Sequence, residues 1–380
     1  MKIFNKSEWK KVKLGDICDI LDSRRIPISE EKRIKGKYPY YGANGIQGYI
    51  NDYIFDEELV LLAEDGGNFG SKTKPIAYKI NGKTWVNNHA HVLKAKNKII
   101  STDFLLYSLM FYNVTKLITG TTRKKLTRTG MEKITLFIPN LDMQEKITNY
   151  LQKIEKFVFF RKNQLTYLKE LNKSLFTRMF GTPEYNEKGW NFISLKDISY
   201  TKGEYGSNKP AINYNGGYRY IRITDINATG ELKTEKVGVS DEEIEAQKYA
   251  LKENDILFAR SGATVGKNFL YNKKYGKCIF AGYLIRFKLN PHLISTKYLK
   301  IYLDTNYYWN WVKNCQNIVA QPNINAKQYG EDLKIMLPPI ELQNKFAERV
   351  EKIEKLSFEI EKSIKEAENL YNSLMNKYFD

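Results

Sequence analysis

The sequence KIEK at residues 153–156 recurs at residues 352–355, an offset of 199 positions (352 − 153). At the same offset Gln144 falls on Gln343, ahead of each KIEK. Matches that keep one offset over this length of chain indicate an internal duplication. We therefore expect one structural unit that is used twice.

Apolar residues continue on both sides of the KIEK repeat in steps that alternate between four and three. This spacing is the a/d pattern of a coiled coil, and neither 141–180 nor 340–380 contains a Pro or Gly that would interrupt a helix. The pattern predicts two long helices that pack against each other, although a core helix in a larger bundle would also show it. The contacting positions would be Leu151, Ile154, Val158, Leu165, Leu168, Leu175, Val350, Ile353, Ile360, Ile364 and Leu374.

The segments before the two helices agree more loosely. The pattern WxxxxLxDI opens each half, at Trp9 and at Trp190. Strand-like and helix-like runs predict an α+β fold in both halves. The strand-like runs are 59–63, 76–80, 85–93, 218–226, 255–260 and 278–288, and the helix-like runs are 103–118 and 296–313. The expected organisation is a domain at 1–140, a helix at 141–181, a domain at 182–336 and a helix at 337–380.

Catalytic and metal-binding motifs are missing from the sequence. The stretch GGNFGSKT at 66–73 resembles a phosphate-binding loop, but Ser71 stands where glycine is required before Lys72. The chain has no GxGxxG before a helix, no HExxH and no GxSxG, and its three cysteines form no CxxC pair. The N-terminus has no apolar signal-peptide core. We expect a cytoplasmic protein without catalytic activity and without a membrane partner.

The charge points to a polyanionic partner. Lys and Arg outnumber Asp and Glu by 61 to 43, a formal net charge of +18. Such an excess favours binding to nucleic acid, although the codon bias of an AT-rich genome would also enrich lysine.

The order of two variable domains and two similar long helices resembles the DNA specificity subunits of type I restriction–modification systems. Local sequences support the resemblance: YPYYGANGI at 38–46 and WVNNHAH at 85–91 are similar to one class of target-recognition domain. YIRITDI at 220–226 and ARSGATVGK at 259–267 are similar to another class. The resemblance implies two target-recognition domains separated by the two helices, which form an antiparallel coiled coil with a pseudo-twofold internal repeat.

The resemblance also implies partners. A specificity subunit joins two adenine-specific DNA methyltransferase subunits on double-stranded DNA with a bipartite target, with or without a further nuclease and translocase subunit. S-adenosylmethionine and ATP with Mg²⁺ would bind to those partners, and this chain would bind no cofactor. Two alternatives remain open from the residues: a duplicated stand-alone DNA-binding regulator, and a coiled-coil scaffold without a DNA function.

DNA contacts are expected from both domains, on glycine-rich loops that carry cations and amides. Arg is suited to read guanine, and Asn or Gln is suited to read adenine. The candidates in the first domain are Asn44, Asn68, Lys72, Asn87, Asn88, His89, Thr121, Thr122, Arg123, Lys124 and Lys125. The candidates in the second domain are Arg222, Arg260, Thr264, Lys267, Tyr283, Gln321 and Asn323. For each single residue, a structural turn or a solvated charge is an equally good interpretation.

Overall fold

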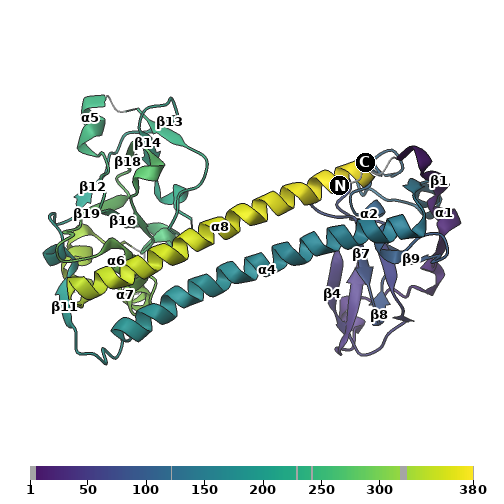
Figure 1. The fold of residues 1–380 in the computed structure, drawn as a ribbon, viewed down its shortest axis with the longest axis horizontal. Helices are drawn as coiled ribbons and strands as arrows, with labels where there is room; N and C mark the ends of the chain where they lie inside the picture. The colour runs from purple at the N-terminus through teal and green to yellow at the C-terminus, as the bar shows by residue number, and fades with distance from the viewer. Residues whose placement is uncertain (1–5, 121, 228–229, 241–242, 317–322, 380) are drawn as a thin grey trace. The chain divides into compact units, whose positions relative to one another are not determined.

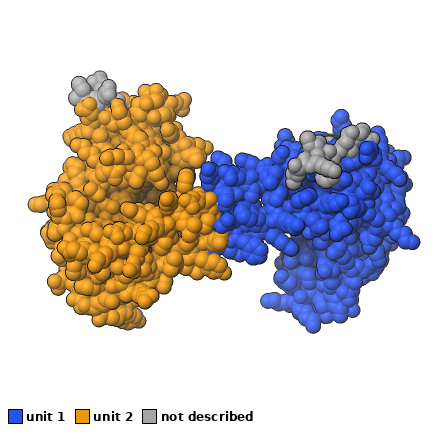
Figure 2. Space-filling model, in the orientation of Figure 1, with its two compact units in different colours: residues 1–163, 361–380 blue, residues 164–360 orange. Residues whose placement is uncertain are grey.

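The structure is a computed structural model, and it describes residues 6–120, 122–227, 230–240, 243–316 and 323–379. The chain divides into two compact units, Met1–Asn163 with Glu361–Asp380, and Gln164–Ile360 (Figure 2). Each unit contains a sheet-rich domain, the start of one long helix and the end of the other. No helix in the described part of the chain is long and apolar enough to cross a bilayer.

The long helices are α4 (Leu141–Phe180) and α8 (Ile340–Phe379), each of 40 residues (Figure 1). In the first unit the beginning of α4 meets the end of α8, where the Tyr371 hydroxyl donates to Glu155 Oε1 over 2.9 Å. In the second unit the end of α4 meets the beginning of α8, where the Phe180 and Phe346 rings lie 5.3 Å apart. The helices are therefore antiparallel. The eleven expected contact positions are all buried or half-buried.

A four-stranded sheet forms the centre of each unit, with the same strand order. The first sheet runs β2 (Cys18–Ile20), β9 (Ala90–Ala95), β6 (Leu59–Ala63) and β7 (Ala77–Ile80). The second runs β12 (Glu204–Tyr205), β19 (Leu284–Lys288), β16 (Asp255–Ala259) and β17 (Asn268–Leu270). All neighbours in both sheets are antiparallel. The duplication seen in the sequence is thus a duplication of topology.

Further elements surround each central sheet, and in the first unit they include a second four-stranded sheet. In the first unit these are β1 (Lys10–Lys13), α1 (Leu14–Ile17), β3 (Tyr38–Gly42), β4 (Gly45–Ile50), β5 (Phe55–Asp56), β8 (Lys83–Val86), α2 (Thr102–Met110), α3 (Arg128–Glu132) and β10 (Thr135–Ile138). In the second they are β11 (Asn191–Ser194), β13 (Ala211–Asn213), β14 (Arg219–Ile221), β15 (Val237–Val239), α5 (Glu243–Lys248), β18 (Cys278–Phe280), α6 (Thr296–Tyr302), α7 (Asn306–Gln316) and β20 (Lys334–Leu337). The β1–β10 pair corresponds to the β11–β20 pair.

A buried glutamine near the start of each long helix ties that helix to its domain, and the two glutamines do so in the same way. Gln144 Oε1 accepts from the Ser101 N–H over 2.9 Å, and Gln343 Oε1 accepts from the Ser295 N–H over 2.9 Å. Each Nε2 donates to the carbonyl of the proline five positions earlier, over 2.9 and 2.7 Å. Because both side chains are fully buried, these hydrogen bonds fix the helix start against the domain. The match at offset 199 therefore has a structural cause.

Several expected elements are wrong in extent. The run 85–93 is two strands of different sheets, separated by a turn in which Asn87 Oδ1 accepts from the His89 N–H over 2.8 Å. The run 218–226 is strand only over β14, and 278–288 divides into β18 and β19. The helical run from 103 ends at Met110, and the one from 296 divides into α6 and α7.

Candidate nucleic-acid interface

In the first domain, four chain segments meet at one edge of the central sheet, which we call the first edge: residues 43–45, 64–68, 87–89 and 122–126. Ala63 at the end of β6 pairs with Ala90 at the start of β9. Beyond this pair the Leu126 N–H donates to the Glu64 carbonyl over 2.7 Å, and Asp65 forms a β-bridge with Lys125. Most first-domain candidates lie on these segments.

Asn44 and Asn68 lie together at the first edge. The Asn68 side-chain amide donates to Asn44 Oδ1 over 3.2 Å, and the Asn44 amide donates to the Gly66 carbonyl over 2.9 Å. Gly66 has a φ of +63°, a conformation that glycine adopts without strain. The glycine turn after β6 therefore brings the two amides together.

A second group at the first edge is held by buried carboxylates. Asp65 Oδ1 lies 2.7 Å from His89 Nδ1 and 2.7 Å from Arg123 Nη2. The Asp65 side chain is 13% exposed, whereas the Arg123 side chain is 64% exposed. Lys125 Nζ lies 2.9 Å from Glu64 Oε1 in the same way. The acids are placed to hold cations at the surface, where a phosphate or a base edge could reach them.

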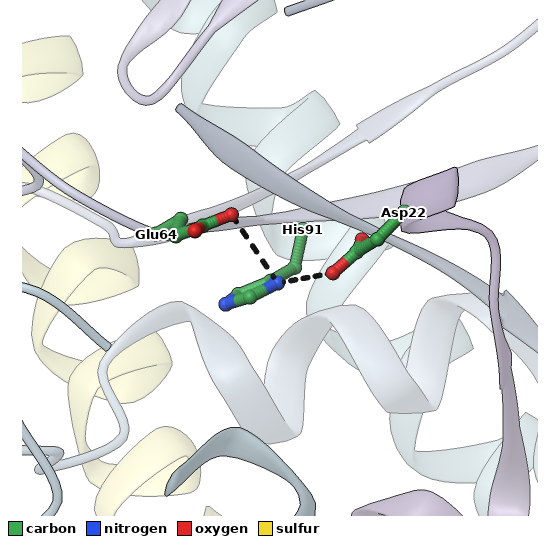
Figure 3. A group of neighbouring side chains, drawn as sticks. All are labelled: Asp22, Glu64 and His91. Carbon is green, nitrogen blue, oxygen red and sulfur yellow. Dashed lines mark hydrogen bonds and ion pairs between the residues drawn. The ribbon is translucent and has the colours of Figure 1, made fainter. Parts of the chain in front are cut away.

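Behind the first edge lies a buried charged group (Figure 3). His91 Nδ1 lies 2.6 Å from Asp22 Oδ2 and 3.7 Å from Glu64 Oε2, and Nε2 lies 2.8 Å from the Leu126 carbonyl. The three side chains are close enough to share a metal ion. Arg25 already supplies a cation to both acids, because its guanidinium lies 2.5 Å from Glu64 Oε2 and 3.5 Å from Asp22 Oδ2. We therefore interpret the group as a cluster of ion pairs that stabilises the domain rather than as a metal site.

The cations determine how these acids titrate. Burial would raise the pKa of Asp22, but the hydrogen bond and charge of His91, the Val92 N–H and Arg25 outweigh it and lower the pKa. Burial likewise opposes ionisation of Glu64, but hydrogen bonds from Arg25 and Lys125 lower its pKa. Both carboxylates are thus stabilised in the charged form.

The second domain has an edge at the equivalent place, which we call the second edge: residues 260–264, 283 and 323–325. Ala259 at the end of β16 pairs with Leu284 at the start of β19. The Ile324 N–H donates to the Arg260 carbonyl over 2.8 Å, and Ser261 forms a β-bridge with Asn323. Arg260 and Ser261 therefore correspond in backbone position to the Glu64 and Asp65 of the first edge.

Arg260 is the centre of the second edge. Its guanidinium carbon lies 4.8 Å from the centre of the Tyr205 ring, and Nε donates to Asn323 Oδ1 over 3.4 Å. Its backbone N–H donates to the carbonyl of Tyr283, a residue that is 63% exposed. The structure thus brings together Arg260, Tyr283 and Asn323. Sequence analysis missed Tyr205, because nothing in the local pattern shows which residue packs on an arginine 55 positions later (260 − 205).

The remaining candidates vary in how free their side chains are. Asn87 is buried, and its amide donates to Gln47 Oε1 over 3.0 Å. Arg222 forms two hydrogen bonds with Asp225, and the Thr264 hydroxyl donates to the Ser261 carbonyl. Other candidate side chains are exposed or half-buried: Lys72, Asn88, Thr122, Lys124 and Lys267. Thr121 and Gln321 lie outside the described residues.

Comparison with known proteins identifies the family. The family model of the type I restriction modification DNA specificity domain matches residues 6–170 and, a second time, residues 187–368. The chain belongs to this family. The two matches correspond to the two target-recognition domains of a specificity subunit. This assignment favours the specificity subunit over the stand-alone regulator and the scaffold.

Relatives of the chain carry matching names. A putative type I restriction enzyme specificity subunit of Haemophilus influenzae is 26% identical over 365 residues, which cover 92% of this chain and 88% of the relative. The MjaVIII specificity subunit of Methanocaldococcus jannaschii is 24% identical over 404 residues, which cover 97% of this chain and 91% of the relative. The crystal structure of a type I system S subunit from M. genitalium covers 100% of this chain and 98% of its own, with a TM-score of 0.61 at 15% identity. That structure shows the same fold.

Proposed function

We propose that this chain selects the target of a type I restriction–modification complex by reading a bipartite DNA sequence, one half-site with each edge. The observation that carries the proposal is the equivalence of the two edges, which share backbone hydrogen bonds but differ in side chains. A common frame with different side chains is what the reading of two different half-sites requires.

The chemistry of the edges suits double-stranded DNA. Side-chain amides and guanidinium groups that project from strand ends can reach base edges in the major groove. The excess of basic over acidic residues, 61 against 43, attracts the chain to phosphates. This attraction carries no sequence information by itself. We assign base contacts to the amide and guanidinium candidates at the edges, and phosphate contacts to exposed lysines such as Lys72 and Lys124.

The chain acts as a recognition subunit without catalytic activity of its own. We propose that it works in the cytoplasm with two adenine-specific methyltransferase subunits, to which a nuclease and translocase subunit can add. In this assembly the partners carry S-adenosylmethionine and ATP with Mg²⁺. We assign one long helix to each methyltransferase, because the internal repeat supplies two related helices, α4 and α8.

Methylation mapping tests the proposal. The chain is coexpressed with its methyltransferase partners in a host that lacks other adenine methylation, and methylated adenines are located by sequencing. The matched control expresses the methyltransferases without the chain. We expect one bipartite motif that appears only when the chain is present. Methylation that ignores the chain, or that follows a single undivided motif, would overturn the proposal.

A further inference from the structure

The arginines of the second domain differ in whether their guanidinium groups are already occupied. Arg222 is occupied by Asp225 through Nε and Nη2, at 3.0 and 2.9 Å. Arg286 is buried and donates to Glu204 and to the Ala250 carbonyl. Arg260 uses Nε, and among the described residues no acceptor binds either of its Nη atoms. Its two terminal nitrogens are therefore available to a ligand.

The orientation of Arg260 is fixed although its terminal nitrogens have no acceptor among the described residues. Its backbone is held on both sides, by the Tyr283 carbonyl at 3.1 Å and by the Ile324 N–H at 2.8 Å. The Tyr205 ring supports one face of the guanidinium at 4.8 Å, and Asn323 Oδ1 accepts from Nε. A planar guanidinium that is oriented before binding loses less conformational entropy when it forms two parallel hydrogen bonds.

We propose that Arg260 reads a guanine in the half-site of the second domain, and that Tyr205 is the residue that positions it. Nη1 and Nη2 donate to guanine O6 and N7 in the major groove, the pairing that a free guanidinium end fits best. The inference deepens the proposed function and rests on it. The inference predicts that the second half-site contains a guanine opposite the second edge.

A phosphate contact is the other use of an exposed arginine, and the geometry favours the base. A phosphate accepts a cation from many directions, so that charge alone provides most of the attraction. The ring of Tyr205 and the oxygen of Asn323 instead fix the plane of the Arg260 guanidinium. Fixing the plane matters for a flat base edge with two acceptors at a set spacing.

The test uses the full chain with its methyltransferase partners and compares the methylated motifs of variants. Arg260→Lys keeps the charge but cannot form the bidentate pair. We expect the preference for guanine at one position of one half-site to fall by roughly 5- to 150-fold, the range that corresponds to about 1–3 kcal/mol. The other half-site stays unchanged. Arg222→Lys is the matched control. Although the sequence made Arg222 a candidate, it lies outside the second edge and Asp225 occupies its guanidinium, so every base preference should stay as it is.

Two further variants test the positioning residue. Tyr205→Leu removes the ring under Arg260 and should relax the same guanine position by a smaller factor than Arg260→Lys. Tyr205→Phe keeps the ring and should retain the preference for guanine. Thermal melting of each complex identifies variants that do not fold. If Tyr205→Leu folds and leaves the guanine preference intact, the positioning role is wrong.

Three outcomes separate this inference from the proposed function. A chain-dependent bipartite motif in which neither half-site responds to Arg260→Lys would overturn the inference and leave the function standing. Weaker methylation by Arg260→Lys at all sites, with the motif unchanged, would reassign Arg260 to a phosphate and also overturn it. Methylation that does not depend on the chain would overturn the function itself.

Discussion

The first and second edges share a backbone frame, but their cations are held in different ways: by acidic side chains at the first edge and by an aromatic ring at the second. At the first edge two acids, Glu64 and Asp65, directly follow the strand β6 and hold Lys125 and Arg123 from another segment. At the second edge the cation itself, Arg260, directly follows the strand β16, and a tyrosine ring supports it. The comparison teaches that the hydrogen-bonded frame is retained while its side chains change, from Glu64 to Arg260 and from Asp65 to Ser261. Sequence specificity can therefore differ between domains without a change of fold.

The largest expected effect comes from replacing one edge entirely. Exchanging residues 1–140 for the corresponding domain of a relative should change one half of the methylated motif and leave the other half unchanged. The reason is that each edge is built from segments of its own domain. Methylation mapping is the measurement, and the reciprocal exchange of residues 182–336 is the control. If both half-sites change together, the two edges do not read independently.

Equivalent frame residues should have equivalent effects on stability. Gln144→Ala and Gln343→Ala each remove the acceptor of a half-buried serine N–H and the donor to two backbone carbonyls. We expect each change to cost about 1–3 kcal/mol of unfolding free energy, and the two values to agree within about 1 kcal/mol. Chemical denaturation measures this, with the exposed neighbour Glu145→Ala as control. A large difference would show that the duplicated frame is unequal in energy.

The side chains at one matched pair of positions should behave differently. Asp65→Ala removes the carboxylate that holds Arg123 and His89, whereas Ser261→Ala alters the equivalent position of the second edge. We expect Asp65→Ala to lower discrimination between cognate and unrelated DNA by roughly three- to tenfold, because Arg123 loses its fixed orientation. Nonspecific affinity should rise slightly, since a negative charge is removed. Competition binding measures both, and an equal response to Ser261→Ala would contradict the comparison.

Sequence patterns predicted the frame well and the side-chain environments poorly, for a physical reason. The helix contact positions, such as Ile154 and Ile353, follow from local spacing, which the chain carries directly. Asn87 offered no local sign that its amide would be buried against Gln47, 40 positions earlier (87 − 47). The strand expected at 85–93 failed because strand-forming residues lie on both sides of Asn87, Asn88 and His89, the polar residues that form the turn between β8 and β9. Long-range partners decide which side chains remain free.

Acidification should loosen the first edge before the second. The pKa values of Asp22 and Glu64 are lowered in the folded chain, so both acids contribute stability that is present above their unfolded pKa values, near 4. That contribution is lost as the pH falls through the folded values. In the second domain, burial raises the pKa of Asp255, so its protonation as the pH falls relieves a cost. Hydrogen exchange at pH 6 and pH 3 should show earlier loss of protection in β6 and β9 than in β16 and β19.

The opposite order of loss, or simultaneous loss in both sheets, would contradict this account. The variant Glu64→Gln provides the control, because it removes the titrating group while keeping a side chain of similar size. It should weaken protection of β6 already at pH 6, since the ion pairs with Arg25 and Lys125 are gone. It should also reduce the further change between pH 6 and pH 3.

The smallest effect is expected from an exposed lysine of the first edge. Lys124 is exposed and lies one position after Arg123, which Asp65 holds. If Lys124 contacts a phosphate, Lys124→Gln should weaken binding by roughly two- to fivefold on every sequence, equivalent to about 0.4–1 kcal/mol. The slope of log affinity against log salt should decrease by about 0.9, the contribution of one phosphate contact. Titrations of cognate and unrelated duplexes at several salt concentrations measure both quantities, with Lys362→Gln on α8 as a charge-matched control. A loss confined to the cognate duplex would instead place Lys124 on a base, and the division between edge residues that read and lysines that attract would then be wrong.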